Sequence, residues 1–270
     1  MYPQISDLEF QDFQVFVHEQ LGIHLHAGKK ALVSGRLNKR LQHFQLRSFA
    51  AYFELIHSAQ GKEERQICID LLTTNETYFF REPKHFEWLR HHAAAATQGP
   101  LRVWSAASSS GDEAYSIAMV LAAHGVQPWQ VLGSDISTRM LECARRAHYS
   151  MARAKSIPED YLKRFCLRGT GQQEGTFLVR RELREQVDFL QLNLNTTLPS
   201  LGQFDIIFLR NVMIYFDTGT KQKVVQRLLH HLKPGGHLCI GHSESLNDLS
   251  HPLVSVAPAI FRLPDSRAPV

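Results

Sequence analysis

The hydrophobic pattern of the chain changes its period near residue 73. Before that point apolar residues recur at helical spacing, which predicts helices at about 7–21, 28–44, 49–59 and 63–72. Ser6 and Glu9 have the spacing of a capping box at the start of the first helix, and Gly22 directly follows its last apolar residue. Residues 1–72 are therefore expected to form an all-α domain.

After residue 100, short apolar runs alternate with helical patterns. The pattern predicts strands at 101–108, 129–137, 204–209, 236–242 and 259–263, and helices at 113–124, 139–147 and 220–232. Such alternation is typical of an α/β domain, a mostly parallel sheet with helices on both faces. We expect this domain to span 89–270, with a linker at 73–88 before it. Residues 166–188 break the alternation and predict a small antiparallel β subdomain.

Composition limits the class of protein. Of the 270 residues, 44% are hydrophobic and 21% are charged, which excludes a disordered or fibrous chain. Four scattered cysteines without a C-x-x-C pair favour a reducing compartment and argue against a zinc ribbon. Residues 117–123, the longest mostly apolar stretch, are too few to span a bilayer, and the first residues lack a signal-peptide pattern. We therefore expect a cytoplasmic protein.

The net charge is only +4, but it is unevenly distributed. Residues 20–53 contain basic side chains and no acid. Lys29, Arg36 and Arg40 project from one side of the predicted helix at 28–44. This basic face is predicted to meet an acidic partner, and a solvated charged surface is the alternative interpretation.

A loop of small residues is the first candidate site. In VWSAASSSGDEAYS, at 103–116, it joins a predicted strand to a helix, so a ligand could approach the backbone and the helix N-terminus. Asp135 ends the next strand, where an acid meets the ribose hydroxyls of a nucleotide in this topology. A single glycine, Gly111, disfavours a pyrophosphate, so an adenosine-type cofactor is the better hypothesis. A capped turn is the alternative.

Two further segments could complete this site. TTNETYFFRE, at 73–82, lies where the two predicted domains meet, which is a favoured place for a small-molecule cleft, although a packed linker is the alternative. The strand in FDIIFLRNVMIYFD, at 204–217, delivers Arg210, Asn211 and Tyr215 to the carboxyl edge of the sheet. A turn-forming Asn and a half-buried aromatic are the alternatives there. The fifteen histidines show no metal-ligand spacing, so no metal is expected.

Together with DFLQLNL at 188–194 and HLKPGGHLCIGHSESL at 231–246, these segments resemble the CheR family. That family comprises bacterial chemotaxis methyltransferases, which esterify glutamates of chemoreceptors (methyl-accepting chemotaxis proteins) with S-adenosylmethionine. The resemblance covers nearly the whole chain. It implies a Rossmann-like class I S-adenosylmethionine-dependent methyltransferase domain after an all-α domain that recognises the receptor. Departures are mild: SSGDEAY stands at 109–115 for the family's S-T-G-E-E-P-Y, and Leu209 replaces a common Cys.

The resemblance also implies the site residues. Those matching cofactor contacts are Asn75, Thr77, Arg81, Glu113, Asp135, Asn193, Leu194, Arg210 and Asn211. Arg81 and Tyr215 match the pair beside the methyl group and are the candidate catalytic residues. A glutamate side chain is already ionised at pH 7 and needs no general base, so we interpret both as orienting the substrate. The product would be S-adenosylhomocysteine, and no metal is required.

Some CheR members bind a C-terminal receptor peptide, and the insertion at 166–188 resembles that kind. TFLVRREL, at 176–183, is predicted to be an edge strand to which an extended peptide could add. The candidate contacts are Arg168, Gly169, Gly171, Gly175 and Arg180. A sheet that only covers the flank of the domain is the alternative. The expected substrate is the helical region of the receptor, and the protein is expected to be a monomer that does not bind nucleic acid. Two rival functions remain: a signalling adaptor without turnover and an RNA methyltransferase.

Overall fold

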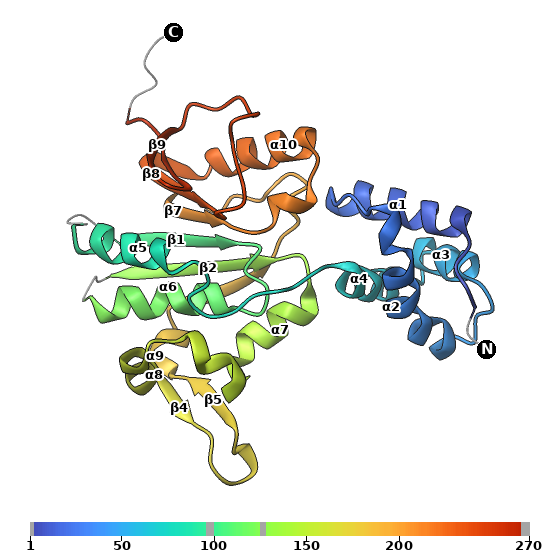
Figure 1. The fold of residues 1–270 in the computed structure, drawn as a ribbon, viewed down its shortest axis with the longest axis horizontal. Helices are drawn as coiled ribbons and strands as arrows, with labels where there is room; N and C mark the ends of the chain where they lie inside the picture. The colour runs from blue at the N-terminus through green and yellow to red at the C-terminus, as the bar shows by residue number, and fades with distance from the viewer. Residues whose placement is uncertain (1–2, 96–99, 125–127, 266–270) are drawn as a thin grey trace.

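The computed structural model describes residues 3–95, 100–124 and 128–265. Its first part is a small helical domain with its own core, set to one side of the molecule (Figure 1). The core is formed by apolar residues between Ile5 and Leu72. Its helices are α1 (Asp7–Leu21), α2 (Lys30–His43), α3 (Phe49–His57) and α4 (Lys62–Leu72), with a 3-10 turn η1 (Ala27–Lys29) before α2.

The predicted boundaries of α1 are confirmed in detail. Ser6 and Glu9 make both bonds of the capping box, and Gly22 ends the helix in a left-handed conformation with φ 72°. The buried side chains of α1 include Phe13 and Val17, one helical turn apart. The helical spacing of the apolar residues therefore identified the face that packs into the core.

The second part is built on a seven-stranded sheet with the order β6-β2-β1-β7-β8-β10-β9. The first five strands are parallel, and the last two are antiparallel. The strands are β1 (Leu101–Ala106), β2 (Trp129–Asp135), β6 (Val187–Gln191), β7 (Phe204–Leu209), β8 (Leu232–Ile240), β9 (Val254–Ala257) and β10 (Ile260–Arg262).

Helices cover both faces of this sheet, as predicted. Helices α5 (Pro83–Ala95) and α6 (Asp112–Ala123) pack on one face, and α10 (Thr218–Leu229) packs on the other. Helix α7 (Thr138–Arg146) contacts α4 of the helical domain. The strand order changes direction between β1 and β7, and in open α/β sheets such a point binds ligands at the carboxyl ends of the strands.

The small antiparallel sheet differs from the sequence-based prediction. It consists of β3 (His148–Ser150), β4 (Cys166–Arg168) and β5 (Thr176–Val179), and it begins well before residue 166 (Figure 1). Because β5 lies between β3 and β4, the prediction of an edge strand at 176–183 is wrong. Two short helices, α8 (Glu159–Phe165) and α9 (Arg181–Arg184), flank the sheet, and residues 187–191 belong to the main sheet instead.

The predicted linker is shorter than expected. Residues 73–82 cross from the helical domain to the α/β domain, but α5 already begins at Pro83. Proline suits the first turn of a helix, where its missing N–H group has no partner to lose. Among the described helices, none combines the length and the apolar character that a bilayer crossing needs.

Candidate functional site

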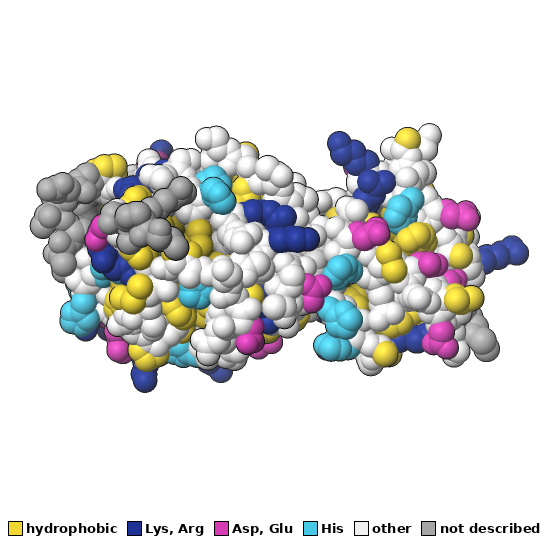
Figure 2. All heavy atoms as spheres, turned by 90° about the horizontal axis from the view of Figure 1, so that it is seen from above, with side chains coloured by type: hydrophobic (Ala, Val, Ile, Leu, Met, Phe, Trp, Pro, Cys, Tyr) yellow, Lys and Arg dark blue, Asp and Glu magenta, His cyan; other side chains and the backbone are white. Residues whose placement is uncertain are grey.

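A cavity of about 780 Å³ lies between the helical domain and the carboxyl edge of the sheet. Figure 2 shows the narrow waist at which the two domains meet. The cavity is lined by all the residues predicted as cofactor-binding or catalytic, namely Asn75, Thr77, Arg81, Glu113, Asp135, Asn193, Leu194, Arg210, Asn211 and Tyr215. The structure therefore brings together residues from the linker, the first turn of α6, the end of β2, and the segments that follow β6 and β7.

The loop after β1 exposes its backbone to this cavity. Ala107 and Ser109 both have positive φ angles, 64° and 49°, which non-glycine residues rarely adopt. Gly111 follows with φ 88°, and a Cβ atom there would lie 2.9 Å from the Cβ of Ala144. The buried hydroxyl of Ser108 lines the cavity and has no hydrogen-bond partner among the described residues. This loop is shaped to receive a ligand rather than to pack on itself.

Asp135 holds that loop in place. Its carboxylate accepts the backbone N–H of Ser109 at 2.8 Å and that of Ser137 at 2.9 Å. Burial raises the pKa of Asp135, although these N–H bonds oppose the shift. Each carboxylate oxygen retains a lone pair, so the group can also accept hydroxyl hydrogens of a ribose. The donor and acceptor set fits an adenosine-type cofactor.

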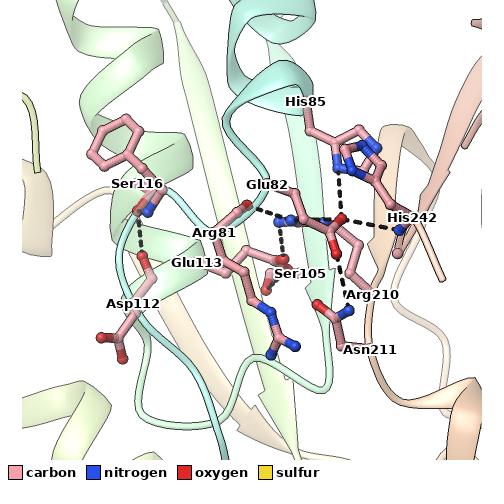
Figure 3. Close-up of polar contacts among 12 residues, drawn as sticks. Arg81, Glu82, His85, Ser105, Asp112, Glu113, Ser116, Arg210, Asn211 and His242 are labelled. Carbon is pink, nitrogen blue, oxygen red and sulfur yellow. Dashed lines mark hydrogen bonds and ion pairs between the residues drawn. The ribbon is translucent and has the colours of Figure 1, made fainter. Parts of the chain in front are cut away.

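A buried ionic cluster lies next to the loop (Figure 3). The guanidinium of Arg210, only 1% exposed, donates to Glu113 at 2.8 Å and to Glu82 at 3.1 Å, and also to the carbonyl of Arg81. Ser105 donates its hydroxyl to Glu113 at 2.6 Å. Two carboxylates thus surround one guanidinium, and their excess negative charge favours a cationic part of a ligand.

Glu82 was not among the predicted site residues. Burial works against its charge, but hydrogen bonds and the positive charge of Arg210 hold the pKa of Glu82 below its ordinary value. Its carboxylate accepts the side-chain amide of Asn211 at 3.0 Å and the backbone N–H of His242 at 3.2 Å. Glu82 closes the motif at 73–82, so its place in that motif was the available signal.

Glu82, His85 and His242 could in principle hold a metal ion, since their ligand atoms all lie within 4.8 Å of one another. His85 is buried, and burial together with nearby Arg210 lowers its pKa to about 3, so its ring is neutral. However, the guanidinium of Arg210 already binds Glu82, and its charge repels a cation. We assign this group to the support of the cavity wall.

Arg81 and Tyr215 face the cavity from different segments. Arg81 donates to the carbonyl of Glu76 at 2.9 Å, and its guanidinium lies 5.7 Å from the centre of the Tyr78 ring. Tyr215 ends the 3-10 turn η4 (Met213–Tyr215), which follows β7. The backbone carbonyl of Tyr215 accepts the N–H of His24 at 2.9 Å, so the helical domain is bonded directly to this turn.

The end of α1 completes the cavity, which the sequence did not predict. Asn193 and Asn195 donate their side-chain amides to the carbonyls of Gln20 at 2.6 Å and of Glu19 at 3.2 Å. Leu21 and residues 23–26 then line the cavity. Helix C-termini present free carbonyls, and these two asparagines satisfy some of them. The adenine-side segment of the predicted site is therefore also the contact that docks the helical domain.

Two side chains of the expected basic face on α2 bond within the helical domain. Arg36 donates to the backbone carbonyls of residues 71–73, and Arg40 pairs with the buried carboxylate of Glu64 at 2.8 and 2.5 Å. Both side chains are only partly exposed and are paired within the helical domain, so they are not fully available to an acidic partner, and partner binding by this face stays a prediction. Lys29 is exposed and lines the cavity.

The candidate peptide contacts of the β subdomain do not line the cavity. Arg168 is exposed on β4, which is an edge strand, whereas the backbone N–H of Arg180 bonds to Phe165 at 2.8 Å. A Cβ at Gly169 would lie 2.0 Å from a backbone oxygen, so the turn after β4 requires a glycine there. Two further glycines of this turn have positive φ, namely Gly171 and Gly175.

Comparisons with known proteins agree with this arrangement. Residues 8–73 match the family model "CheR methyltransferase, all-alpha domain", and residues 75–258 match "CheR methyltransferase, SAM binding domain". The chemotaxis protein methyltransferase of Escherichia coli K12 is 43% identical over 96% of this chain and 92% of its own length. Chemotaxis protein methyltransferase 2 of Pseudomonas aeruginosa PAO1 is 42% identical over 94% of this chain and 92% of its own.

The two matched segments correspond to the helical domain and to the α/β domain that share the cavity. The predicted fold class and the predicted cofactor, S-adenosylmethionine, are thereby confirmed. Relatives match over nearly the whole chain, and no large part of it is left without a counterpart. With its all-α domain, its S-adenosylmethionine-binding domain and the cavity between them, the chain belongs to the CheR methyltransferase family.

Proposed function

We propose that this protein transfers the methyl group of S-adenosylmethionine to glutamate side chains of chemoreceptors, for sensory adaptation. The products would be glutamate methyl esters and S-adenosylhomocysteine. One observation carries the proposal: Arg81 and Tyr215 line the same cavity as the predicted cofactor contacts. The names of the relatives, all chemotaxis methyltransferases, support the choice of substrate.

Methyl transfer to a carboxylate needs few catalytic groups from the protein. S-adenosylmethionine, when bound, supplies an activated methyl group and its own leaving group. A glutamate carboxylate with a pKa near 4.3 is already ionised at pH 7, so no residue has to remove a proton. What remains is to hold the carboxylate about 3–3.5 Å from the methyl carbon, in line, and to exclude water. Arg81 can hold one carboxylate oxygen and the hydroxyl of Tyr215 can direct the other.

The cofactor contacts divide the cavity wall into three parts. Asp135 would accept the ribose hydroxyls, and Asn193 and Leu194 would lie on the adenine side. Glu113 would face the amino-acid portion, because its pair with Arg210 leaves excess negative charge in the cluster. The remaining contacts would come from the linker and from the end of β7, namely Asn75, Thr77, Arg81, Arg210 and Asn211.

Transfer of radiolabel from S-adenosylmethionine tests the reaction directly. Receptor-containing membranes should become labelled and lose the label in mild base, as glutamate esters do, whereas RNA should not. An adaptor without turnover would label neither, and an RNA methyltransferase would label RNA. Either result would contradict the proposal.

The two catalytic candidates are tested by substitution. Tyr215→Phe should lower kcat about tenfold or more and leave the Kd for S-adenosylmethionine nearly unchanged, because only the direction of the carboxylate is lost. Arg81→Ala should affect both constants. Tyr161→Phe, outside the cavity, serves as the matched control. If calorimetry shows that Tyr215→Phe abolishes cofactor binding while turnover per bound cofactor stays normal, the orienting role is wrong.

The helical region of the receptor is the proposed partner of the cavity mouth, where Lys29 is exposed. We also propose that a C-terminal receptor peptide adds to β4, because β4 is an edge strand and carries exposed Arg168. Titration of free receptor-tail peptides should show micromolar binding that Arg168→Glu weakens and Arg181→Glu, outside the strand, does not. Peptides that fail to bind the wild type would exclude this tether. The protein would act as a cytoplasmic monomer.

A further inference from the structure

Glu244 lies behind the turn that carries Tyr215. Its Oε2 atom accepts the backbone N–H of Gly241 at 2.7 Å and that of Asn211 at 2.9 Å, and its Oε1 atom accepts the N–H of Ile214 at 3.3 Å. One carboxylate therefore joins the end of β8 to the loop after β7 and to η4. Burial raises the pKa of Glu244, and the backbone N–H bonds oppose that shift because they stabilise the ionised carboxylate.

The backbone around Glu244 is arranged for this contact. Asn211 has a φ of 58°, a left-handed conformation that asparagine tolerates better than most residues. A Cβ atom at Gly241 would lie 2.7 Å from the side-chain nitrogen of Asn211 and 2.8 Å from Oε2 of Glu244. Only a glycine lets the three groups approach so closely, so the loop conformation and the carboxylate depend on each other.

Apolar packing holds η4 through Met213 and through Phe216, which directly follows the turn; both are buried. Met213 is buried, but Ile214 is 50% exposed and Tyr215 is only partly buried. From the other side, the turn is bonded to the helical domain through the N–H of His24. The position of the Tyr215 ring on the cavity wall thus depends also on polar contacts to the backbone of the turn, and Glu244 provides a side-chain contact of this kind from within the α/β domain.

We propose that Glu244 is a positioning residue for Tyr215, which fixes η4 so that the tyrosine hydroxyl reaches the carboxylate of the substrate. This inference rests on the orienting role of Tyr215 proposed above. Glu244 does not line the cavity, and it acts through the turn and through the backbone of Asn211. Its loss should therefore reduce the rate of methyl transfer more than the affinity for the cofactor.

Glu244→Gln tests the proposal with a side chain of equal size. The amide keeps one acceptor oxygen but turns its NH₂ group toward backbone N–H donors, so the turn loses at least one attachment. We expect kcat to fall about tenfold, since a small misplacement of an orienting group is enough for that, and the Kd for S-adenosylmethionine to rise by no more than about threefold. Asp248→Asn, an exposed carboxylate in the same loop, is the matched control.

A double-mutant cycle with Tyr215→Phe separates positioning from a general structural defect. If Glu244 acts through the tyrosine hydroxyl, Glu244→Gln should lower kcat by less than about twofold in the Tyr215→Phe background. Hydrogen exchange of the amides of 211–214 should also become faster in Glu244→Gln. Rates are compared per cofactor-bound enzyme, so that unfolded protein does not enter the result.

Two results overturn the inference. One is a wild-type kcat in Glu244→Gln. The other is that Glu244→Gln lowers kcat as much in the Tyr215→Phe background as it does in the wild type. A wild-type kcat in Tyr215→Phe would contradict the proposed role of Tyr215. That result concerns the proposed function, and a different variant tests it. If Glu244→Gln does not fold, the same cycle is run with Glu244→Asp, which keeps the charge but withdraws the carboxylate from the turn, and the same outcomes decide.

Discussion

Replacing Arg36 with alanine should destabilise the protein rather than only remove a surface charge. One nitrogen of its guanidinium, Nη1, donates to the carbonyls of Leu71, Leu72 and Thr73 at 3.0, 3.2 and 3.0 Å. These are carbonyls at the end of α4, where a positive charge is also favoured by the helix dipole. Because Nη1 carries only two hydrogens, no more than two of the three bonds are strong at once.

The expected magnitude follows from that geometry. A charged hydrogen bond contributes about 1.5–3 kcal/mol, and partial exposure of Arg36 places it near the lower end, so we expect a loss of about 2 kcal/mol. For a chain of this size, that corresponds to a fall in Tm of about 4–8 °C. The side chain also fixes the start of the linker that carries Asn75, so the Kd for S-adenosylmethionine should rise modestly.

Thermal unfolding followed by circular dichroism or calorimetry gives the Tm directly. Lys39→Ala is the matched control, since Lys39 is an exposed cation on the same helix, and its Tm should stay near that of the wild type. The Tm of Arg36→Lys should lie between those of Arg36→Ala and the wild type, because an ammonium can reach fewer of the carbonyls. A wild-type Tm in Arg36→Ala, combined with a raised KM for receptors, would refute the reasoning and make Arg36 a free cation of the docking surface.

Two further predictions concern acidic residues. Asp135→Asn should weaken S-adenosylmethionine binding about tenfold or more, because one of two backbone N–H groups loses its carboxylate oxygen. Calorimetry measures the Kd, with Asp188→Asn, a change at an exposed carboxylate, as the control. An unchanged Kd in Asp135→Asn would contradict the prediction. His18 lowers the pKa of Asp217 to about 2, so the stability gained from this carboxylate is present above its ordinary pKa of 3.8 and is lost as the pH falls toward 2. The stability difference between wild type and His18→Ala, measured by urea titration, should therefore be smaller at pH 3 than at pH 5, and an equal difference at both would exclude the pair.

Local patterns predicted most of the elements because their causes are local. The strand at 204–209 has the predicted bounds, since its apolar residues form a run that is too short for a helix, is rich in Ile and Phe, and ends at the polar pair Arg210 and Asn211. Helix α1 is also confirmed, because the residues that begin and end it, the capping box of Ser6 and Glu9 and the glycine Gly22, lie within a few residues of its ends. Asp135, Arg210, Asn211 and Tyr215 lie at or after the ends of parallel strands, so they were expected at one edge of the sheet, whereas the other lining residues were implied by the resemblance to the CheR family.

What the sequence did not predict depends on partners far away in the chain. The ion pair between Arg40 and Glu64 was not predicted, because Glu64 lies on another helix and no local signal pairs them. The position of β5 in the middle of its sheet requires pairing with β3, more than twenty residues earlier. Glu82 and Glu244 stand inside recognised motifs, but which backbone groups they hold is decided only when the β7 and β8 loops come together.

The docking of α1 has a consequence for how such proteins diversify. Asn193 and Asn195 bind main-chain carbonyls of Glu19 and Gln20, so the contact does not depend on which side chains those positions carry. Gly22 is constrained by space, since a Cβ there would lie 2.6 Å from a methyl group on α10. A helical domain from a relative, grafted at residue 73, should therefore dock when it keeps Gly22 together with His18 and Asp70, whose side chains bond to Asp217 and to the backbone N–H groups of residues 138 and 139.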